Sequence, residues 1–341
     1  MNDELPGLPT PVSGTVAKLR ERIEINEQRE KLTAAQRKLL DQSAIIFGEP
    51  ATRQDAAYLP RELVQVTLPH RNPGNIPVWR RTNGNLTIGI QPGADLTTGE
   101  SYGYPYGTVP RLLLFWVTTE AVQKKSRRLE LGNSLRGFMA ELGLNSSNGS
   151  SGAKRSDARR LRNQMQRLFQ AHISFQGTPE RNGQQGEIRL NMQVADATEF
   201  WWSHKDPDQA ALWGSWIELG EKFYDAITAY PVPADIRALR ALKRSALALD
   251  LYAWLSYEAF RAHRSRKTRF ENWMQLHTHL GAEYARPNDF RRKAKDALRK
   301  ITTVYPGLKL GDKQGGIQVL PESWPSIQPR NLTITGTAKA L

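Results

Sequence analysis

The sequence predicts an α+β fold made of tandem winged-helix domains behind an N-terminal helical extension. The segment Ser156-Asp157-Ala158-Arg159-Arg160 is echoed 132 residues later by Asn288-Asp289-Phe290-Arg291-Arg292. An apolar segment that ends in Leu-Gly precedes each copy, at Leu142-Gly143 and at Leu280-Gly281. A short β-rich run with glycine at its turn follows each copy. The predicted order of helix, turn, basic helix and hairpin therefore occurs twice, which is typical of two linked winged-helix modules.

Length and composition suit two folded domains with extensions. At 341 residues the chain exceeds one ordinary domain, and a hydrophobic content of 39% with nine tryptophans is sufficient for two cores. We place an N-terminal extension at 1–58, the first winged-helix domain at 59–205, the second at 206–322 and a C-terminal tail at 323–341.

The charge of the chain indicates a polyanionic partner. The formal net charge is +14, yet residues 1–58 carry 8 Lys/Arg against 9 Asp/Glu. The rest of the chain therefore carries +15, so the basicity belongs to the predicted domains. There is no cysteine, which excludes disulfides and thiolate metal sites. The sequence lacks an apolar run of about 18 residues, so we expect a soluble cytoplasmic protein without a membrane partner.

The first 90 residues contain a helix signal followed by strand signals. Residues 15–47 are charged and helix-favouring, and their imperfect apolar stripe predicts a helix that packs on the body or on a second subunit. A β-rich run at 63–68 predicts a strand. Residues 77–81 lead into Asn83-Gly84, after which apolar residues alternate to Ile90. Asn-Gly between such runs predicts a hairpin with a type I′ turn, because both residues tolerate a positive φ.

The two predicted domains share one plan. The first is expected to hold an apolar helix, a short helix, a flexible loop, the basic helix and a hairpin, at 111–122, 134–142, 145–152, 156–172 and 173–194. The second is expected to hold a strand, a short helix, a long apolar helix, a helix–turn–helix pair and a hairpin, at 217–227, 234–242, 245–261, 270–304 and 308–320.

Each basic helix is predicted to bury one face and expose another. The inward residues recur at helical spacing and are Leu161, Met165, Leu168 and Phe169 in the first copy and Phe290, Ala294, Ala297, Leu298 and Ile301 in the second. Residues 154–167 hold 6 Lys/Arg and 1 Asp, and residues 286–300 hold 7 Lys/Arg and 2 Asp/Glu. Each helix is predicted to open at a small polar cap, Ser156 in the first copy and Asn288 in the second.

One charged helix face is usually only solvated, but two at matching positions favour DNA binding. Arginine pairs with guanine edges, asparagine and glutamine pair with adenine edges, and lysine suits phosphates. The candidate DNA-binding residues are Arg159, Arg160, Asn163, Gln166, Arg291, Arg292, Lys295 and Arg299 on the helices and Lys309 and Lys313 near the second hairpin.

Signals for catalysis, cofactors and metals are weak in this sequence. The segment 149–154 lacks the spacing of a phosphate-binding loop. His277 and His279 lie on different helix faces without a third ligand nearby, so we expect no metal site. An ordered nucleophile and base, or clustered carboxylates, are also missing. We therefore expect a protein that is not an enzyme and needs no cofactor.

A longer run of residues resembles the plasmid-encoded RepA replication initiators. It includes Pro110-Arg111-Leu112-Leu113-Leu114, Leu131-Gly132-Asn133-Ser134-Leu135, Glu141-Leu142-Gly143-Leu144 and Arg167-Leu168-Phe169, and it covers about 60–200. The resemblance implies a bacterial origin whose repeats (iterons) are bound by tandem winged helices. It also implies a host replicative helicase and a host initiator protein as partners, and a homodimer distinct from the DNA-active monomer.

Three other functions compete with replication initiation. A winged-helix transcriptional regulator would bind an operator without supporting plasmid maintenance. A nicking initiator enzyme would need a tyrosine, such as Tyr284 or Tyr305, with a metal-bound histidine pair. The context of His277-Thr278-His279 is too polar for that pair. A structural or partner-binding protein would have no use for a body of charge +15.

Overall fold

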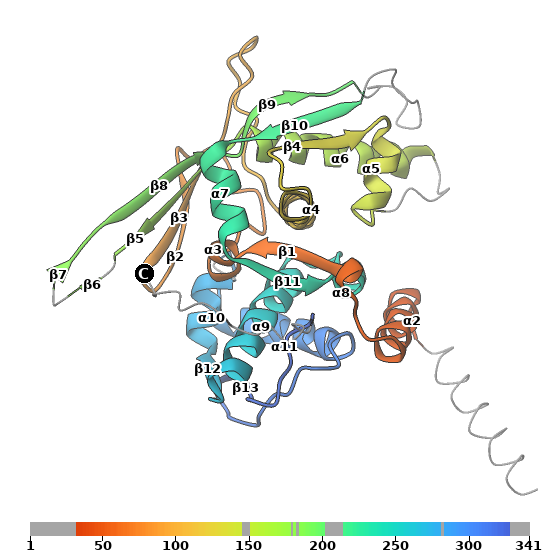
Figure 1. The fold of residues 1–341 in the computed structure, drawn as a ribbon, viewed down its shortest axis with the longest axis vertical. Coiled ribbons are helices and arrows are strands. Elements are labelled where there is room, and N and C mark those ends of the chain that lie inside the picture. Colours follow the sequence, from red (N-terminus) through yellow and green to blue (C-terminus); the bar gives the residue numbers. More distant parts are fainter. Residues whose placement is uncertain are drawn as a thin grey trace, which may run out of the picture.

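The computed structural model describes residues 32–144, 151–178, 180–181, 184–201, 214–280 and 283–327. Figure 1 shows two largely helical groups, with α4, α5 and α6 above and α9, α10 and α11 below. A small sheet of strands β1 and β11 lies between them, and the sheet that contains β2, β3, β5 and β8 projects to one side. Mixed helices and strands make this an α+β fold.

The N-terminal part begins with α2 (Ala34–Gly48), which a capping box of Thr33 and Gln36 starts and which packs against α8. The remainder of the predicted helix at 15–47 lies outside the described residues. After the 3-10 turn η1 (Arg53–Asp55) come β1 (Ala56–Pro60) and the short helix α3 (Arg61–Gln65). The strand predicted at 63–68 is therefore wrong, because 63–65 belong to α3 and 66–68 form no strand. Adjacent Leu63 and Val64 are both buried, and a helical turn accommodates this where an alternating strand does not.

The predicted hairpin after residue 77 is confirmed as β2 (Trp79–Asn83) and β3 (Leu86–Gln91). Its turn differs from the prediction, because Asn83 pairs with Leu86 inside the ladder and the turn residues are Gly84 and Asn85. Of these two only Gly84 has a positive φ, of 55°. The type I′ prediction for Asn83-Gly84 was therefore wrong. The side-chain amide of Asn83 donates to the Gln65 carbonyl at 3.0 Å, which holds Asn83 at the end of the strand.

The first repeat runs through α4 (Thr108–Lys124), β4 (Arg128–Gly132), α5 (Leu135–Glu141) and α6 (Ser151–Phe169). A hairpin of β5 (His172–Gly177) and β8 (Ile188–Gln193) follows, with β6 (Glu180–Arg181) and β7 (Gln184–Gln185) at its tip. This hairpin joins β2 and β3 in the order β2-β3-β5-β8. Strand β9 (Ala195–Glu199) continues beyond β8, and β10 (Ser215–Leu219) lies between β4 and β9.

The connection between the repeats contains α7 (Glu221–Ala229), β11 (Pro231–Asp235) and α8 (Ile236–Leu242). The strand predicted at 217–227 is thus β10 followed by a helix. The helix predicted at 234–242 starts two residues later, because the Asp235 side chain caps it by accepting from the Arg237 amide at 2.9 Å. Strand β11 pairs antiparallel with β1, from Ala56 opposite Asp235 to Pro60 opposite Pro231.

The second repeat runs through α9 (Ala246–Ser265), β12 (Arg269–Asn272), α10 (Trp273–Leu280), α11 (Pro287–Thr302) and β13 (Gly316–Val319). Strand β12 pairs directly with β13, and Leu310 bridges to Val319 to complete the hairpin. Both repeats thus follow the order helix, strand, helix, helix, hairpin. They differ in the sheet, because β10 separates β4 from β9 in the first repeat.

The two repeats share one hydrophobic core. Helices α4 and α9 are apolar on nearly every side, pack against each other, and lie in a single cluster of buried residues that extends into both repeats. The β1–β11 ladder likewise joins segments on either side of the predicted boundary at 205. In the part of the chain that the structure describes, no helix has the length and apolar character needed to cross a membrane.

Candidate nucleic-acid interface

Helix α11 presents the charged face that its sequence predicts. Arg291, Arg292, Lys295 and Arg299 are exposed, while Phe290, Ala294, Ala297 and Ile301 are buried and Leu298 is partly buried. The side chain of Arg292 is 70% exposed, and its Nη2 lies 3.4 Å from Asp289 one turn earlier. Arg299 pairs in the same way with Asp296. Such exposed pairs are weak, so these guanidinium groups remain available to a ligand.

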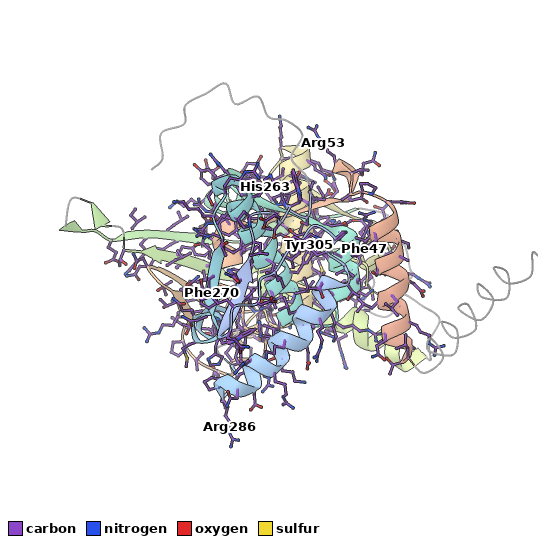
Figure 2. The ribbon with its side chains drawn as sticks, turned by 90° about the horizontal axis from the view of Figure 1, so that it is seen from below. Phe47, Arg53, His263, Phe270, Arg286 and Tyr305 are labelled. Atoms are coloured by element: carbon purple, nitrogen blue, oxygen red, sulfur yellow. The ribbon has the colours of Figure 1, made fainter. Side chains whose placement is uncertain are left out.

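The start of α11 corrects the predicted cap. The helix begins at Pro287 with Arg286 at the capping position, so Asn288 lies inside its first turn. Proline suits a first helical position because its φ is already helical and its missing N–H has no partner to lose there. Figure 2 shows Arg286 projecting away from the body at this end of the helix. The helix therefore starts two residues earlier than a cap at Asn288 predicts.

Helix α6 exposes the second set of predicted residues. Arg159, Arg160, Asn163 and Gln166 are exposed, while Leu161, Met165, Leu168 and Phe169 are buried. The helix begins at Ser151, so Ser156 lies within it and does not cap it. The predicted flexible loop at 145–152 therefore ends earlier than expected, and its residues 145–150 lie outside the described part of the chain.

The two basic helices are not identical in detail. Arg160 Nη2 donates to the Thr108 hydroxyl at 3.2 Å. Arg167, the counterpart of Arg299 in the sequence echo, is only partly exposed and lies 5.2 Å from the centre of the Tyr106 ring. It also donates to the Tyr104 carbonyl at 3.4 Å. Arg167 therefore secures the loop before α4, whereas Arg299 faces solvent.

The second hairpin places both predicted lysines on the surface. Lys309 is held through its backbone, because its N–H donates to Ser323 Oγ at 3.0 Å and its carbonyl accepts from that hydroxyl at 2.9 Å. Lys313 Nζ lies 4.1 Å from the centre of the Phe270 ring, which belongs to β12. The aromatic ring restrains this lysine near the hairpin tip while leaving its charge exposed.

A buried ion pair joins the first helices of the two repeats. Arg111 of α4 donates from Nε to Asp250 Oδ1 and from Nη2 to Asp250 Oδ2, both at 2.7 Å. The same guanidinium also donates to the backbone carbonyls of Leu68, Pro69 and Gly107. Five donors are thus satisfied in a planar arrangement that arginine alone among the basic side chains provides.

A second buried pair extends this cluster to the start of α11. Arg81 of β2 donates from Nη2 to Glu283 Oε1 at 2.8 Å, and Glu283 lies between α10 and α11. His70 connects the two pairs, because its Nε2 lies 2.8 Å from Asp250 Oδ2 and its backbone N–H donates to Glu283 Oε1 at 3.2 Å. We call Arg81, Arg111, His70, Asp250 and Glu283 the junction cluster.

The protonation states of the junction cluster follow from its charges. Burial alone would raise the pKa of the Asp250 carboxyl, but Arg111 and hydrogen bonds from His70 and Arg111 hold that pKa well below its ordinary value. Burial, together with Arg111, lowers the pKa of His70. Burial also lowers the pKa of Arg81 to about 10, against the influence of Glu283. Two cations and two anions therefore balance around a neutral imidazole.

The two histidines of α10 have separate environments. His277 Nε2 lies 3.0 Å from the Tyr284 carbonyl. His279 is buried beside Trp254, neither ring nitrogen has a hydrogen-bond partner among the described residues, and burial lowers its pKa to about 4. Among those residues no three metal-ligating side chains come together. Tyr305 is also buried, with its hydroxyl donating to the Trp324 carbonyl at 2.8 Å and its pKa raised by burial (Figure 2).

The junction cluster was not among the predicted functional residues. Its signal was present, because Arg111 and Asp250 are each a single charge within an otherwise apolar helical run. A lone charge at such a position indicates a buried partner. The pairing itself joins residues 139 apart and depends on how α4 and α9 meet.

The chain is similar to one known protein family and to two solved structures. A family model described as plasmid-encoded RepA protein matches residues 104–275. A crystal structure of selenomethionine derivatives of domains 2 and 3 of RctB is similar over 76% of this chain and 97% of that chain, with 13% identity and a TM-score of 0.45. A second structure of RctB domains 2–3 is similar over 75% and 94%, with 13% identity and a TM-score of 0.39. The search of curated proteins found no match.

Proposed function

The chain belongs to the family of plasmid-encoded RepA proteins, and from that premise we propose that it initiates plasmid replication by binding repeated duplex sequences at an origin. Each repeat is proposed to act as a winged-helix module. The observation that carries the proposal is the pair of basic helices, α6 and α11, which occupy the same place in the same order of elements and expose cationic and amide side chains.

The chemistry of these side chains suits the major groove. Arg159 and Arg292 offer two donors in a plane, which match the O6 and N7 acceptors of guanine. Asn163 and Gln166 offer a donor and an acceptor that match adenine. Lys309 and Lys313 are proposed to contact phosphates, which position the protein on DNA without specifying sequence.

The shared core and the junction cluster support simultaneous binding by both helices. Arg111 and Asp250 connect α4 with α9, and Glu283 connects the segment between α10 and α11 to β2. A rigid connection avoids the entropic cost of ordering two independent modules on DNA. Two recognition helices one helical turn apart would cover a site of about 20 bp.

The family resemblance extends the proposal to the steps after binding. We propose that bound molecules promote origin opening in the bacterial cytoplasm and recruit a host replicative helicase with a host initiator protein. We also propose a homodimer that differs from the DNA-active monomer. No cofactor or catalytic step is required for these roles, since binding energy alone would drive them.

The test is footprinting on DNA that adjoins this gene, followed by a maintenance assay. The full chain is expected to protect repeated sites, and a plasmid that carries them is expected to replicate only with the intact protein. The Tyr284→Phe and Tyr305→Phe variants are expected to support replication, because no nicking step is proposed. Protection of an operator without origin-dependent maintenance would instead identify a winged-helix transcriptional regulator.

A further inference from the structure

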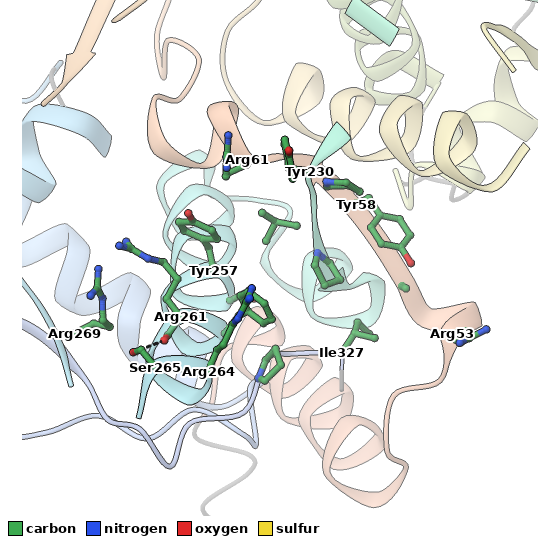
Figure 3. A pocket seen from close by; sticks show the side chains of 17 residues that line it. Arg53, Tyr58, Arg61, Tyr230, Tyr257, Arg261, Arg264, Ser265, Arg269 and Ile327 are labelled. Carbon is green, nitrogen blue, oxygen red and sulfur yellow. Dashed lines mark hydrogen bonds between the residues drawn. The ribbon is translucent and has the colours of Figure 1, made fainter. Parts of the chain in front are cut away.

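A groove lies between the two-stranded sheet of β1 and β11 and helix α9, and it is separate from the exposed faces of α6 and α11. It has a volume of about 1030 Å³ and is lined by residues of η1, β1, α3, β11, the second half of α9 and β12, by Tyr230 and by the segment 325–327. Figure 3 shows side chains from the sheet and from α9 directed into the same space. We call it the arginine–tyrosine groove after its labelled residues.

The groove has an excess of positive charge. Among the described residues no Asp or Glu lines the groove. Five arginines line it, namely Arg53, Arg61, Arg261, Arg264 and Arg269. Buried Glu258 behind the surface pairs with Arg261 at 2.7 Å and Arg269 at 3.1 Å, and Glu62 pairs with Arg61 at 3.0 Å.

Two of these arginines remain free to bind an anion. Arg53 and Arg264 are exposed, and neither has an ion pair within the described part of the chain. They stand on different elements, η1 and α9, and Figure 3 shows Arg53 at the edge of the groove, well apart from Arg264. An occupant that contacts both must therefore carry negative charge at more than one point along its length.

Aromatic rings lie between the cations. Tyr58, Tyr230, Tyr257 and Phe260 line the groove, with Tyr230 62% exposed and Phe260 39% exposed. The Arg61 guanidinium lies 4.7 Å from the centre of the Tyr230 ring. Arg261 lies 5.4 Å from that of Tyr257. Exposed rings beside guanidinium groups provide stacking platforms for bases next to contacts for phosphates.

The shape and charge of the groove distinguish among polyanions and peptides. A DNA duplex keeps its bases inside the stack, so a ring on the protein can stack only on bases of a separated strand. The chain's own segment 328–341 carries Arg330 and Lys339 and no acidic residue, so its charge opposes binding beside the arginines. An acidic peptide would satisfy the charges but leave the exposed rings without a planar partner.

We propose that the arginine–tyrosine groove binds a segment of single-stranded DNA, with Arg53 and Arg264 on its phosphates and Tyr230 stacking on a base. This activity lies beyond duplex binding by α6 and α11. It would let the protein hold one strand of DNA that has already been separated, whichever agent separates it.

The experiment measures fluorescence anisotropy of the full chain with a labelled oligothymidine and with a duplex. The variants are Tyr230→Ala, Arg264→Ala and Arg53→Ala, all at exposed side chains, and circular dichroism checks that each is folded. Arg244→Ala is the matched control, because Arg244 is exposed and lies outside the groove. A variant of α11, Arg292→Ala, separates the two binding surfaces.

We expect Tyr230→Ala to bind the oligothymidine roughly tenfold more weakly. The two arginine variants are expected to weaken it with a smaller dependence on salt, and Arg244→Ala is expected to match the parent protein. Duplex binding is expected to change only in Arg292→Ala. If the parent protein itself binds the oligothymidine but no duplex, the result would count against the proposed function alone.

Two results would overturn the groove proposal. One is equal oligothymidine affinity in the parent protein and the three groove variants. The other is binding of an acidic, tyrosine-containing peptide that the groove variants abolish while strand binding is unchanged, which would assign the groove to a protein partner.

Discussion

Arg111 and Asp250 form a bidentate ion pair, with two bonds of 2.7 Å, at the contact between the first helices of the two repeats. Both side chains are almost fully buried. The pair therefore fixes α4 against α9 in one geometry, since a shift of either helix would leave a charge unpaired in the core. Because α4 and α9 belong to different repeats, the pair also helps to set how α6 and α11 lie relative to each other.

Removing one partner of this pair should be costly. In Asp250→Asn the Arg111 guanidinium loses its counter-charge while remaining buried, and we expect the free energy of unfolding to fall by about 3–5 kcal/mol. Urea unfolding followed by circular dichroism measures it. The matched control is Glu187→Gln, whose exposed pair with Arg189 spans 2.8 Å and should contribute little. Equal unfolding midpoints for both variants would contradict a structural role for Asp250.

The stability of the protein should decrease on acidification below neutral pH. Burial lowers the pKa of His279 from 6.5 to about 4, so between these values the unfolded chain binds a proton that the native chain does not. Stability is therefore present above pH 6.5 and declines as the pH falls towards 4, by up to about 3 kcal/mol from this residue. His70, whose pKa is also lowered, acts in the same direction.

The variant His279→Phe isolates this contribution. Phenylalanine retains a ring beside Trp254 and cannot take up a proton, so unfolding free energies measured from pH 7 to pH 5 should vary less than in the parent. Replacement of exposed His172 by Gln is the control and should leave the dependence on pH as it was. The account of His279 fails if both variants keep the slope of the parent protein.

Lys313 should affect DNA affinity without affecting sequence preference. If it contacts a phosphate, Lys313→Ala weakens binding to repeat and unrelated duplexes by the same factor, and the slope of log K against log salt decreases by roughly 0.9. Titrations at several salt concentrations measure both quantities. Lys222→Ala, at an exposed position on α7, is the control. A loss confined to the repeat sequence would show instead that Lys313 reads a base.

Local periodicity predicted what depends on local chemistry. The buried faces of α6 and α11 and the β2–β3 hairpin follow from spacing within a few turns, and the structure confirms them. The caps at Ser156 and Asn288 were wrong because each helix begins before the polar residue nearest to the charged run. Capping depends on where the chain enters the helix, and the preceding loop decides that.

Features that combine distant segments of the chain could not be predicted from the sequence. The junction cluster brings together His70, Arg111, Asp250 and Glu283. The arginine–tyrosine groove likewise needs Arg53 and Arg264, more than two hundred residues apart, to face one space. Neither the cluster nor the groove has a periodic signature in the sequence, because each is created by the tertiary packing of α4, α9 and the sheet of β1 and β11.

The most direct test of simultaneous binding by α6 and α11 is footprinting with one substitution in each helix. The parent protein is expected to protect about 20 bp of each repeat, spanning two successive major grooves. Arg159→Ala and Arg292→Ala are each expected to cost about 1–3 kcal/mol of specific affinity and to expose a different half of the site. Unchanged protection and affinity in either variant would contradict the claim that both helices bind the same duplex.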